Sequence, residues 1–217
     1  MSKSVTPEAA AAIALQSLLT LPVVNAPAVR TIRRQWSKLL QPESAPYVLR
    51  FTKPLLDEAQ WSTRLLACEI LAHHEQAFAS LNDRRIESMA RGLADWGSVD
   101  LFGVTLSGPA WLKGRLSTAR VRVWARSRDR WRRRLALVST VRLNVPGRDG
   151  RGDAERTLDV CGMLVSDRDP IVVKALSWAL RALAKRDRKA VNEFVVIHRE
   201  ALPALVNREV RNWLASK

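Results

Sequence analysis

The sequence predicts an all-α chain, most simply an α-solenoid of short helix pairs. Apolar residues recur at three-and-four spacing along almost the whole chain, as between Val172 and Leu183. Turn-forming residues divide the chain into pieces of about one helix each, which gives roughly a dozen helices. Period-2 alternation is confined to short stretches such as 121–124, where flanking helix formers argue against a strand.

The first helix is predicted to begin at Thr6-Pro7-Glu8, a helix-start signature without the basic region of a signal peptide. The following breaks are predicted, in chain order, at 22–27, 42–46, 82–83, 97–98, 108–109, 126–129, 167–170, 186–188 and 203. A glycine- and arginine-rich loop at 146–153 separates a helix ending near Leu143 from one beginning near Glu155.

Three pieces of the chain resemble one another. Residues 61–67, 131–137 and 170–176 each place a basic residue just before a stretch of small and aliphatic residues. This is typical of HEAT-type repeats, whose period is about 40 residues. We therefore expect residues 1–217 to form a single HEAT-like repeat domain.

The charge of the chain favours a polyanionic partner. The 217 residues carry a formal net charge of +15, with 11 basic and 10 acidic residues up to Gly108 and 25 and 11 after it. This asymmetry predicts a basic face built from the later helices, with duplex DNA as the leading partner and an anionic membrane surface second. No segment is long and apolar enough to span a bilayer.

The chain offers no pattern for a metal or a cofactor, and we expect neither. Cys68 and Cys161 lie in apolar helical contexts without metal-type spacing, which predicts core thiols in a reducing, cytoplasmic compartment. The histidines at 73, 74 and 198 form no ligand set, and no glycine-rich phosphate loop is present.

The first candidate for chemistry is the segment from Trp96 to Asp100. In one interpretation Ser98 or Asp100 caps the following helix and Trp96 fills the core. In the other, a carboxylate lies beside an aromatic face on a DNA-binding surface. The residues alone favour the structural interpretation.

Two further candidates are basic. Residues 113–134 hold ten basic residues and one acid, Asp129, a density best explained by neutralising phosphates. The second set, Lys174, Trp178, Arg181 and Lys185, is spaced by three or four residues and so shares one helix face.

At these three segments the sequence resembles the AlkD-like DNA alkylation repair family, HEAT-like-repeat glycosylases that excise N3- and N7-alkylpurines. The matching features are Trp96 followed four residues later by Asp100, the stretch 124–134, and the stretch 174–187 leading to 207–214. The resemblance covers nearly the whole chain and is weakest over the first 50 residues and the 146–153 loop.

The resemblance implies a glycosylase of base excision repair that acts on double-stranded DNA. Nothing in the sequence singles out the lysine amine that a β-lyase step would need, so we expect a monofunctional enzyme, and we expect a monomer. Asp100 would be the catalytic carboxylate, and Trp96 and Trp178 would flank the lesion. The implied contacts to the DNA backbone are Arg134 or Arg133, together with Arg130, Arg181 and Lys185.

The residue types suit that reaction. A cationic N3- or N7-alkylpurine is already a good leaving group, so one carboxylate can stabilise the developing sugar cation and position water. Two indole faces favour a cationic lesion by about 0.5–2 kcal/mol each. The family's frequent aromatic residue on the first helix pair is replaced here by the run Ile13, Ala14, Leu15, which leaves the lesion range open.

Two alternatives remain. A non-catalytic HEAT-repeat protein that binds branched or distorted DNA would have the same basic face, although it would gain nothing from an acidic group facing phosphates. A helical scaffold for an acidic protein would also be basic but would not require the combination of Trp96, Asp100 and Trp178.

Overall fold

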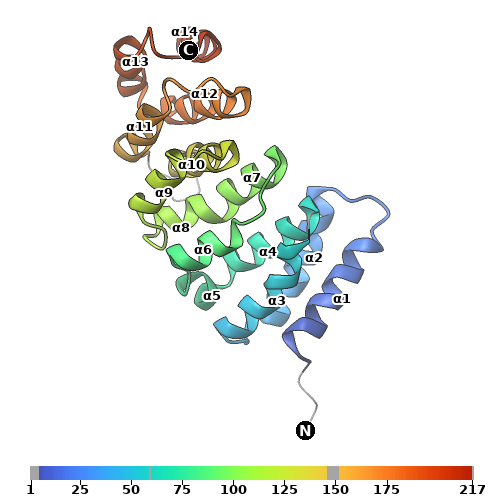
Figure 1. The fold of residues 1–217 in the computed structure, drawn as a ribbon. Coiled ribbons are helices and arrows are strands. Elements are labelled where there is room, and N and C mark those ends of the chain that lie inside the picture. The colour runs from blue at the N-terminus through green and yellow to red at the C-terminus, as the bar shows by residue number, and fades with distance from the viewer. Residues whose placement is uncertain (1–4, 59, 146–151, 217) are drawn as a thin grey trace. The chain divides into compact units, whose positions relative to one another are not determined.

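The computed structural model describes residues 5–58, 60–145 and 152–216, and all regular secondary structure there is helical (Figure 1). The all-α prediction is therefore confirmed. The chain divides into two compact units, an N-terminal unit of Met1–Arg91 and a C-terminal unit of Gly92–Lys217. That residues 1–217 act as a single domain stays a prediction. In the described ranges no helix has the length and apolarity needed to cross a membrane.

The N-terminal unit is built around one buried helix. Its helices are α1 (Pro7–Leu19), α2 (Ala26–Leu40), α3 (Ala45–Asp57), α4 (Trp61–His73), α5 (Glu75–Ala79) and α6 (Asp83–Met89). Every residue of α4 from Ser62 to Leu71 is buried, because α2, α3 and α5 all pack on it. The charge of Glu69 inside this core is met by Arg30 and Arg33 of α2.

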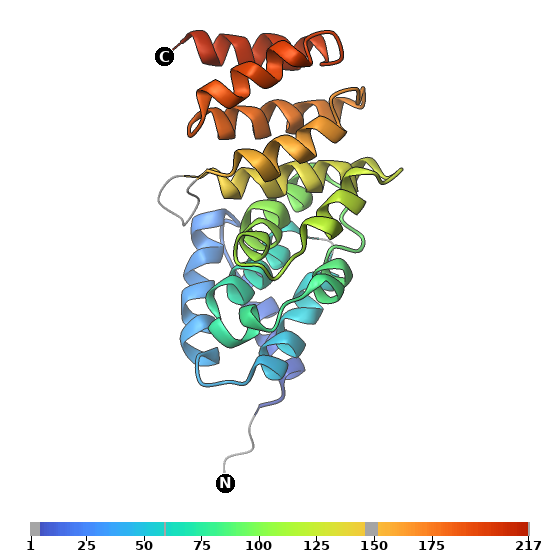
Figure 2. The same cartoon turned by 90° about the vertical axis from the view of Figure 1, so that its left-hand side faces the viewer.

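The C-terminal unit consists of a long first helix followed by three helix pairs. The first helix is α7 (Trp96–Phe102), η1 (Gly103–Ser107) and α8 (Gly108–Leu112), and the pairs are α9 (Thr118–Ala125) with α10 (Arg130–Leu143), α11 (Ala154–Met163) with α12 (Pro170–Ala184), and α13 (Arg188–Ile197) with α14 (Ala204–Ala215). Within this unit α10 packs on the first helix, α12 on α10 and α14 on α12, as Figure 2 shows. Each second helix of a pair thus forms one layer of the core.

Side-chain caps explain where most of these helices begin. Asp129, Asp169 and Asp187 each accept a backbone N–H in the first turn of α10, α12 and α13. Such a cap typically contributes about 1 kcal/mol. These three caps fall at the breaks predicted at 126–129, 167–170 and 186–188.

The break predicted at 108–109 is wrong, and the one predicted at 97–98 is displaced, because the break lies between Met89 and Trp96. Residues 97–98 and 108–109 lie inside the continuous helical stretch from Trp96 to Leu112. The π-helical segment η1 carries the chain into Gly108 with helical dihedrals, and Pro109 occupies the first turn of α8, where its missing N–H is tolerated. Turn-forming residues therefore marked a helix irregularity here and not a turn.

The buried thiols behave as core residues. Cys68 and Cys161 are both fully buried and free. Burial raises the pKa of Cys68 to about 12 and also raises that of Cys161, so both thiols stay protonated and unreactive near neutral pH.

Candidate active site

Asp100 lies on the less buried face of α7, and Trp96 precedes it by one turn. Helix α7 begins because Asp95 accepts the backbone N–H of Ser98 at 2.8 Å. The cap is therefore neither Ser98 nor Asp100, so the structural interpretation of this segment is wrong about its cap. It is also wrong about the core, because the Trp96 side chain is 68% exposed.

A single arginine holds the Asp100 carboxylate. Arg134 of α10 donates from Nε to Oδ1 at 2.7 Å and from Nη2 to Oδ2 at 2.6 Å. Its third nitrogen, Nη1, donates to the Ile171 carbonyl at the start of α12, also at 2.6 Å. Three helices thus meet at this guanidinium, whose donors lock both its own orientation and that of the carboxylate.

Two opposing effects act on the acidity of Asp100. Burial raises the pKa of Asp100 above its ordinary value, and the two hydrogen bonds and the charge of Arg134 work in the opposite direction. Asp95 adds a smaller upward contribution. The result is a carboxylate that has lost part of its hydration and keeps Arg134 as its charge partner.

Close backbone packing fixes the register between the Asp100 helix and α10. A Cβ at Gly103 would lie 2.6 Å from Val138 Cγ1, and one at Gly108 would lie 2.5 Å from Arg142 Cβ. Between them, the Ser107 and Ser139 hydroxyls are 2.7 Å apart. The paired residues advance together along both helices, which run in the same direction and bring Asp100 opposite Arg134.

The predicted stripe on α12 is present on one face. Lys174, Trp178, Arg181 and Lys185 are exposed or half-buried, whereas Ala175, Leu176, Ala179 and Leu180 between them are buried. Trp178 lies two turns after Ile171, whose carbonyl binds Arg134. Arg181 donates to Glu209 of α14 at 2.7 Å, so part of its charge is already neutralised.

The structure separates Arg133 from Arg134. Arg133 donates from Nε to Asp167 at 2.6 Å and from Nη1 to the carbonyls of Ser127 and Arg128. It therefore ties α10 to the turns before α10 and α12. Arg134, and not Arg133, is the one that reaches Asp100.

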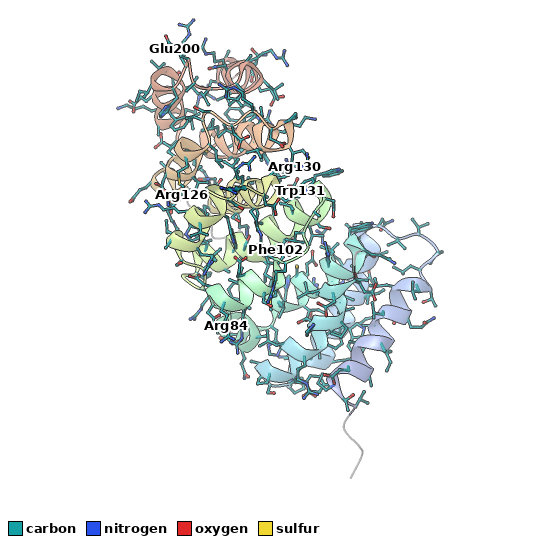
Figure 3. The ribbon with its side chains drawn as sticks, viewed as in Figure 1. Arg84, Phe102, Arg126, Arg130, Trp131 and Glu200 are labelled. Atoms are coloured by element: carbon teal, nitrogen blue, oxygen red, sulfur yellow. The ribbon has the colours of Figure 1, made fainter. Side chains whose placement is uncertain are left out.

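Several arginines of the basic segment 113–134 already pair with carboxylates, which the sequence of the segment does not indicate. Arg122 pairs with Asp159, Arg133 with Asp167, and Arg130 lies 3.8 Å from Asp169. The premise that the ten charges meet almost no compensation was wrong, because at least four of the arginines have acidic partners elsewhere in the fold, Arg134 with Asp100 among them. Arg130 also stacks over the Trp131 ring at 5.2 Å, and Figure 3 shows the two side chains together.

Sequence reasoning missed the residues that hold the site in place. Asp95, which caps α7, was detectable because an Asp three residues before Ser98 fits the N-cap pattern. Asp167 and Glu209 bind arginines 34 and 28 residues away, and no local pattern indicates such pairs.

No ring contact or hydrogen bond joins Trp96 to Trp178 in the described ranges. The structure thus groups Asp100 with Arg134 and with the exposed Trp96 one turn before it, and it places Trp178 on the basic face of α12 two turns after Ile171.

Comparison with known proteins assigns the chain to a family. No curated protein matches it. The family model described as DNA alkylation repair enzyme matches residues 21–214, nearly the whole chain and all of the helices that carry the site. The chain therefore belongs to the DNA alkylation repair enzyme family, with DNA as its partner.

Proposed function

We propose that the protein is a monofunctional DNA glycosylase that hydrolyses the N-glycosidic bond of cationic N3- and N7-alkylpurines in duplex DNA. The observation that carries the proposal is the Asp100 carboxylate, partly desolvated and held by Arg134 one turn from the exposed Trp96. In the reaction the C1′–N bond breaks and its electron pair neutralises the cationic base. Water adds to C1′ and gives up a proton, which Asp100 accepts and passes to solvent.

Both indoles support a preference for cationic lesions. Trp96 offers an exposed indole face, and tryptophan is among the residues enriched where proteins contact a partner. Trp178 is half-buried on the α12 face that also carries Lys174 and Lys185. A cation beside an indole gains about 0.5–2 kcal/mol, and a neutral base does not.

Backbone contacts are proposed for the cations that keep donors to spare. Lys174 and Lys185 are exposed and without an ion pair among the described residues, and Arg130 keeps a loose pair with Asp169. Arg181 and Arg133 already pair with Glu209 and Asp167, so less of their charge is left to offset a phosphate. Arg134 is proposed to act through Asp100 and not as the main backbone contact.

The stacked pairs of the C-terminal unit support a solenoid of HEAT-like repeats. The pairs α9–α10, α11–α12 and α13–α14 repeat one arrangement, in which each second helix packs on the one before it. We propose that the second helices carry the basic, concave DNA-binding face.

One observation favours a second candidate function, a non-catalytic protein that binds distorted DNA. The pair with Arg134 gives Asp100 a structural role of its own, because loss of either partner would leave a half-buried charge. A pure binder could therefore keep Asp100 for stability.

Single-turnover release of base from a duplex carrying one N7-methylguanine separates the two functions. Wild type is compared with Asp100→Asn at saturating enzyme, and Asp159→Asn serves as a matched control that breaks the surface pair with Arg122 in the same unit. A glycosylase predicts release that collapses in Asp100→Asn alone, with duplex affinity retained. Binding by all three proteins without release of this base or of a bulkier cationic adduct would favour the binder.

A further inference from the structure

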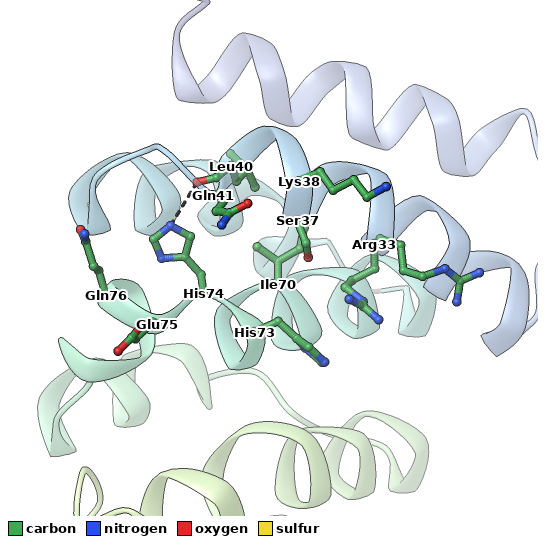
Figure 4. Close-up of a pocket in the computed structure, with 11 residues that line it drawn as sticks. Arg33, Ser37, Lys38, Leu40, Gln41, Ile70, His73, His74, Glu75 and Gln76 are labelled. Carbon is green, nitrogen blue, oxygen red and sulfur yellow. Dashed lines mark hydrogen bonds between the residues drawn. The ribbon is translucent and has the colours of Figure 1, made fainter.

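The N-terminal unit contains a pocket that the proposed reaction does not use. It has a volume of about 570 Å³ and lies between α2 and the junction of α4 and α5 (Figure 4). The residues that line it are Arg33, Arg34, Ser37, Lys38, Leu40, Gln41, Ile70, His73, His74, Glu75 and Gln76.

Positive groups gather at one end of this pocket. Figure 4 shows Arg33, Lys38 and His73 toward one end and Glu75 and Gln76 toward the other. Arg34 and Lys38 are four residues apart on α2, so two like charges share a helix face. Such a pair costs about 0.2–0.5 kcal/mol unless an anion lies between the charges.

Arg33 shares the Glu69 carboxylate with Arg30, whereas Arg34 and Lys38 have no acidic partner among the described residues. The Glu69 carboxylate already accepts from Arg30 Nε at 2.7 Å, and its second oxygen lies 3.5 Å from Arg33 Nε. In the described part of the chain Lys38 has no ion pair, and the hydrogen bond of the Arg34 side chain goes to the Thr31 hydroxyl. The two terminal nitrogens of Arg33 likewise have no hydrogen-bond acceptor among the described residues, so their N–H groups are available to a ligand.

Polar groups in the pocket also lack partners. The Ser37 Oγ is buried and has no hydrogen-bond partner among the described residues. His73 Nδ1 lies 2.7 Å from the Glu69 carbonyl oxygen. Because a carbonyl oxygen only accepts hydrogen bonds, Nδ1 must be the donor, and Nε2 has no partner among the described residues. His74 is fully used, because its two nitrogens bind the Leu40 carbonyl and the Ala77 N–H.

We infer that this pocket binds a phosphate group. Two guanidinium groups and an ammonium supply charge-assisted donors, and a buried hydroxyl supplies another, which is the donor set that phosphate oxygens favour. The group can come from a phosphodiester of the DNA backbone or from a free phosphorylated compound. The pocket lies in the N-terminal unit and Asp100 in the C-terminal one, so the inference does not depend on the proposed base excision.

A charge-matched pair of variants tests the inference. The pocket variant is Arg34→Gln/Lys38→Gln, and the control is Lys53→Gln/Arg84→Gln, which removes the same charge from exposed positions outside the pocket in the same unit. Pyrophosphate binding is measured by calorimetry on the full chain. Binding of undamaged duplex is measured by anisotropy over a range of salt concentrations.

Each source of phosphate gives its own result. A free phosphoryl ligand predicts that pyrophosphate affinity falls at least about tenfold in the pocket variant alone, with duplex affinity equal in the two variants. A backbone phosphate predicts weaker duplex binding and a salt slope smaller by about 1 in the pocket variant alone, since each neutralised phosphate contributes roughly 0.9. If the two variants match in both measurements, the inference is overturned.

Ser37→Ala gives an independent check without a change of charge. Because Ser37 Oγ has no partner in the described protein, this substitution should leave the Tm unchanged and weaken phosphate binding several-fold. A lower Tm with unchanged binding would assign the hydroxyl to the fold and count against the pocket. Neither readout requires release of a base.

Discussion

Arg134 grips Asp100 through two parallel hydrogen bonds and uses its remaining nitrogen on the Ile171 carbonyl, so one side chain fixes the carboxylate relative to both α10 and α12. A lysine keeps the charge but cannot form this fork. Arg134→Lys should therefore slow single-turnover base release by about 10- to 100-fold, with duplex affinity within a few-fold of wild type.

Arg133→Lys is the matched control for that variant. It removes the fork to Asp167 and the carbonyls of Ser127 and Arg128 and leaves Asp100 untouched. We expect it to lower the free energy of unfolding by about 1–3 kcal/mol while the rate of base release stays near wild type. Equal loss of rate in the two variants would contradict the positioning role of Arg134.

Trp96→Ala should separate function from stability. The side chain is 68% exposed, so its removal should change the free energy of unfolding by less than about 0.5 kcal/mol. Release of N7-methylguanine should nevertheless slow by about 3- to 30-fold, since a cation–indole contact is lost. Trp61→Ala, at a 40% exposed indole in the N-terminal unit, is the control and should leave the rate unchanged.

Gly103→Ala should be strongly destabilising. The added Cβ would lie 2.6 Å from Val138 Cγ1, so η1 and α10 must separate or Val138 must move, at a cost of about 1–3 kcal/mol. Gly162→Ala in α11 meets Phe194 only at 4.0 Å and should stabilise the chain by about 0.5–1 kcal/mol. Urea unfolding of both variants measures the difference, and a neutral Gly103→Ala would mean that the packing at η1 is loose.

The pH dependence of base release should follow Asp100. Burial raises the pKa of Asp100, and only its ionised form can stabilise the developing cation, so the rate should fall with decreasing pH at values above the ordinary 3.8. The folded chain binds this proton more tightly than the unfolded chain. The contribution of Asp100 to stability therefore grows as pH falls through the raised pKa and is complete below the unfolded value.

Single-turnover rates across acidic pH, corrected for spontaneous loss of the base, measure this acidic limb of the pH–rate profile. Circular dichroism at each pH confirms that the protein is folded. Asp159→Asn should keep the limb unchanged, because Asp159 lies in a surface pair with Arg122. A rate that stays level down to the pKa of an ordinary aspartate would remove Asp100 from the chemical step.

The sequence alone predicted the features that depend on residues close together in the chain. The apolar period of 3.6 predicted helices throughout, because burial on one helix face depends only on residues three and four apart. The breaks at 126–129 and 167–170 were readable for a similar reason, since Asp129 and Asp169 cap the helices that follow within three residues. The surface stripe of Lys174 and Trp178 was likewise a matter of spacing along one helix.

Only the tertiary structure decided which charged side chains form ion pairs and that the Trp96 side chain faces solvent. Arg134 and Asp100 are 34 residues apart, and the close approach at Gly103 sets the register in which they meet. The same glycine-rich helix defeated the turn prediction at 108–109, because packing on α10 outweighed local turn preference. By itself the sequence determined the helices, the net charge and the family, since these depend on composition and short-range order. Ion pairs and exposure depend on which distant residues the packing brings together.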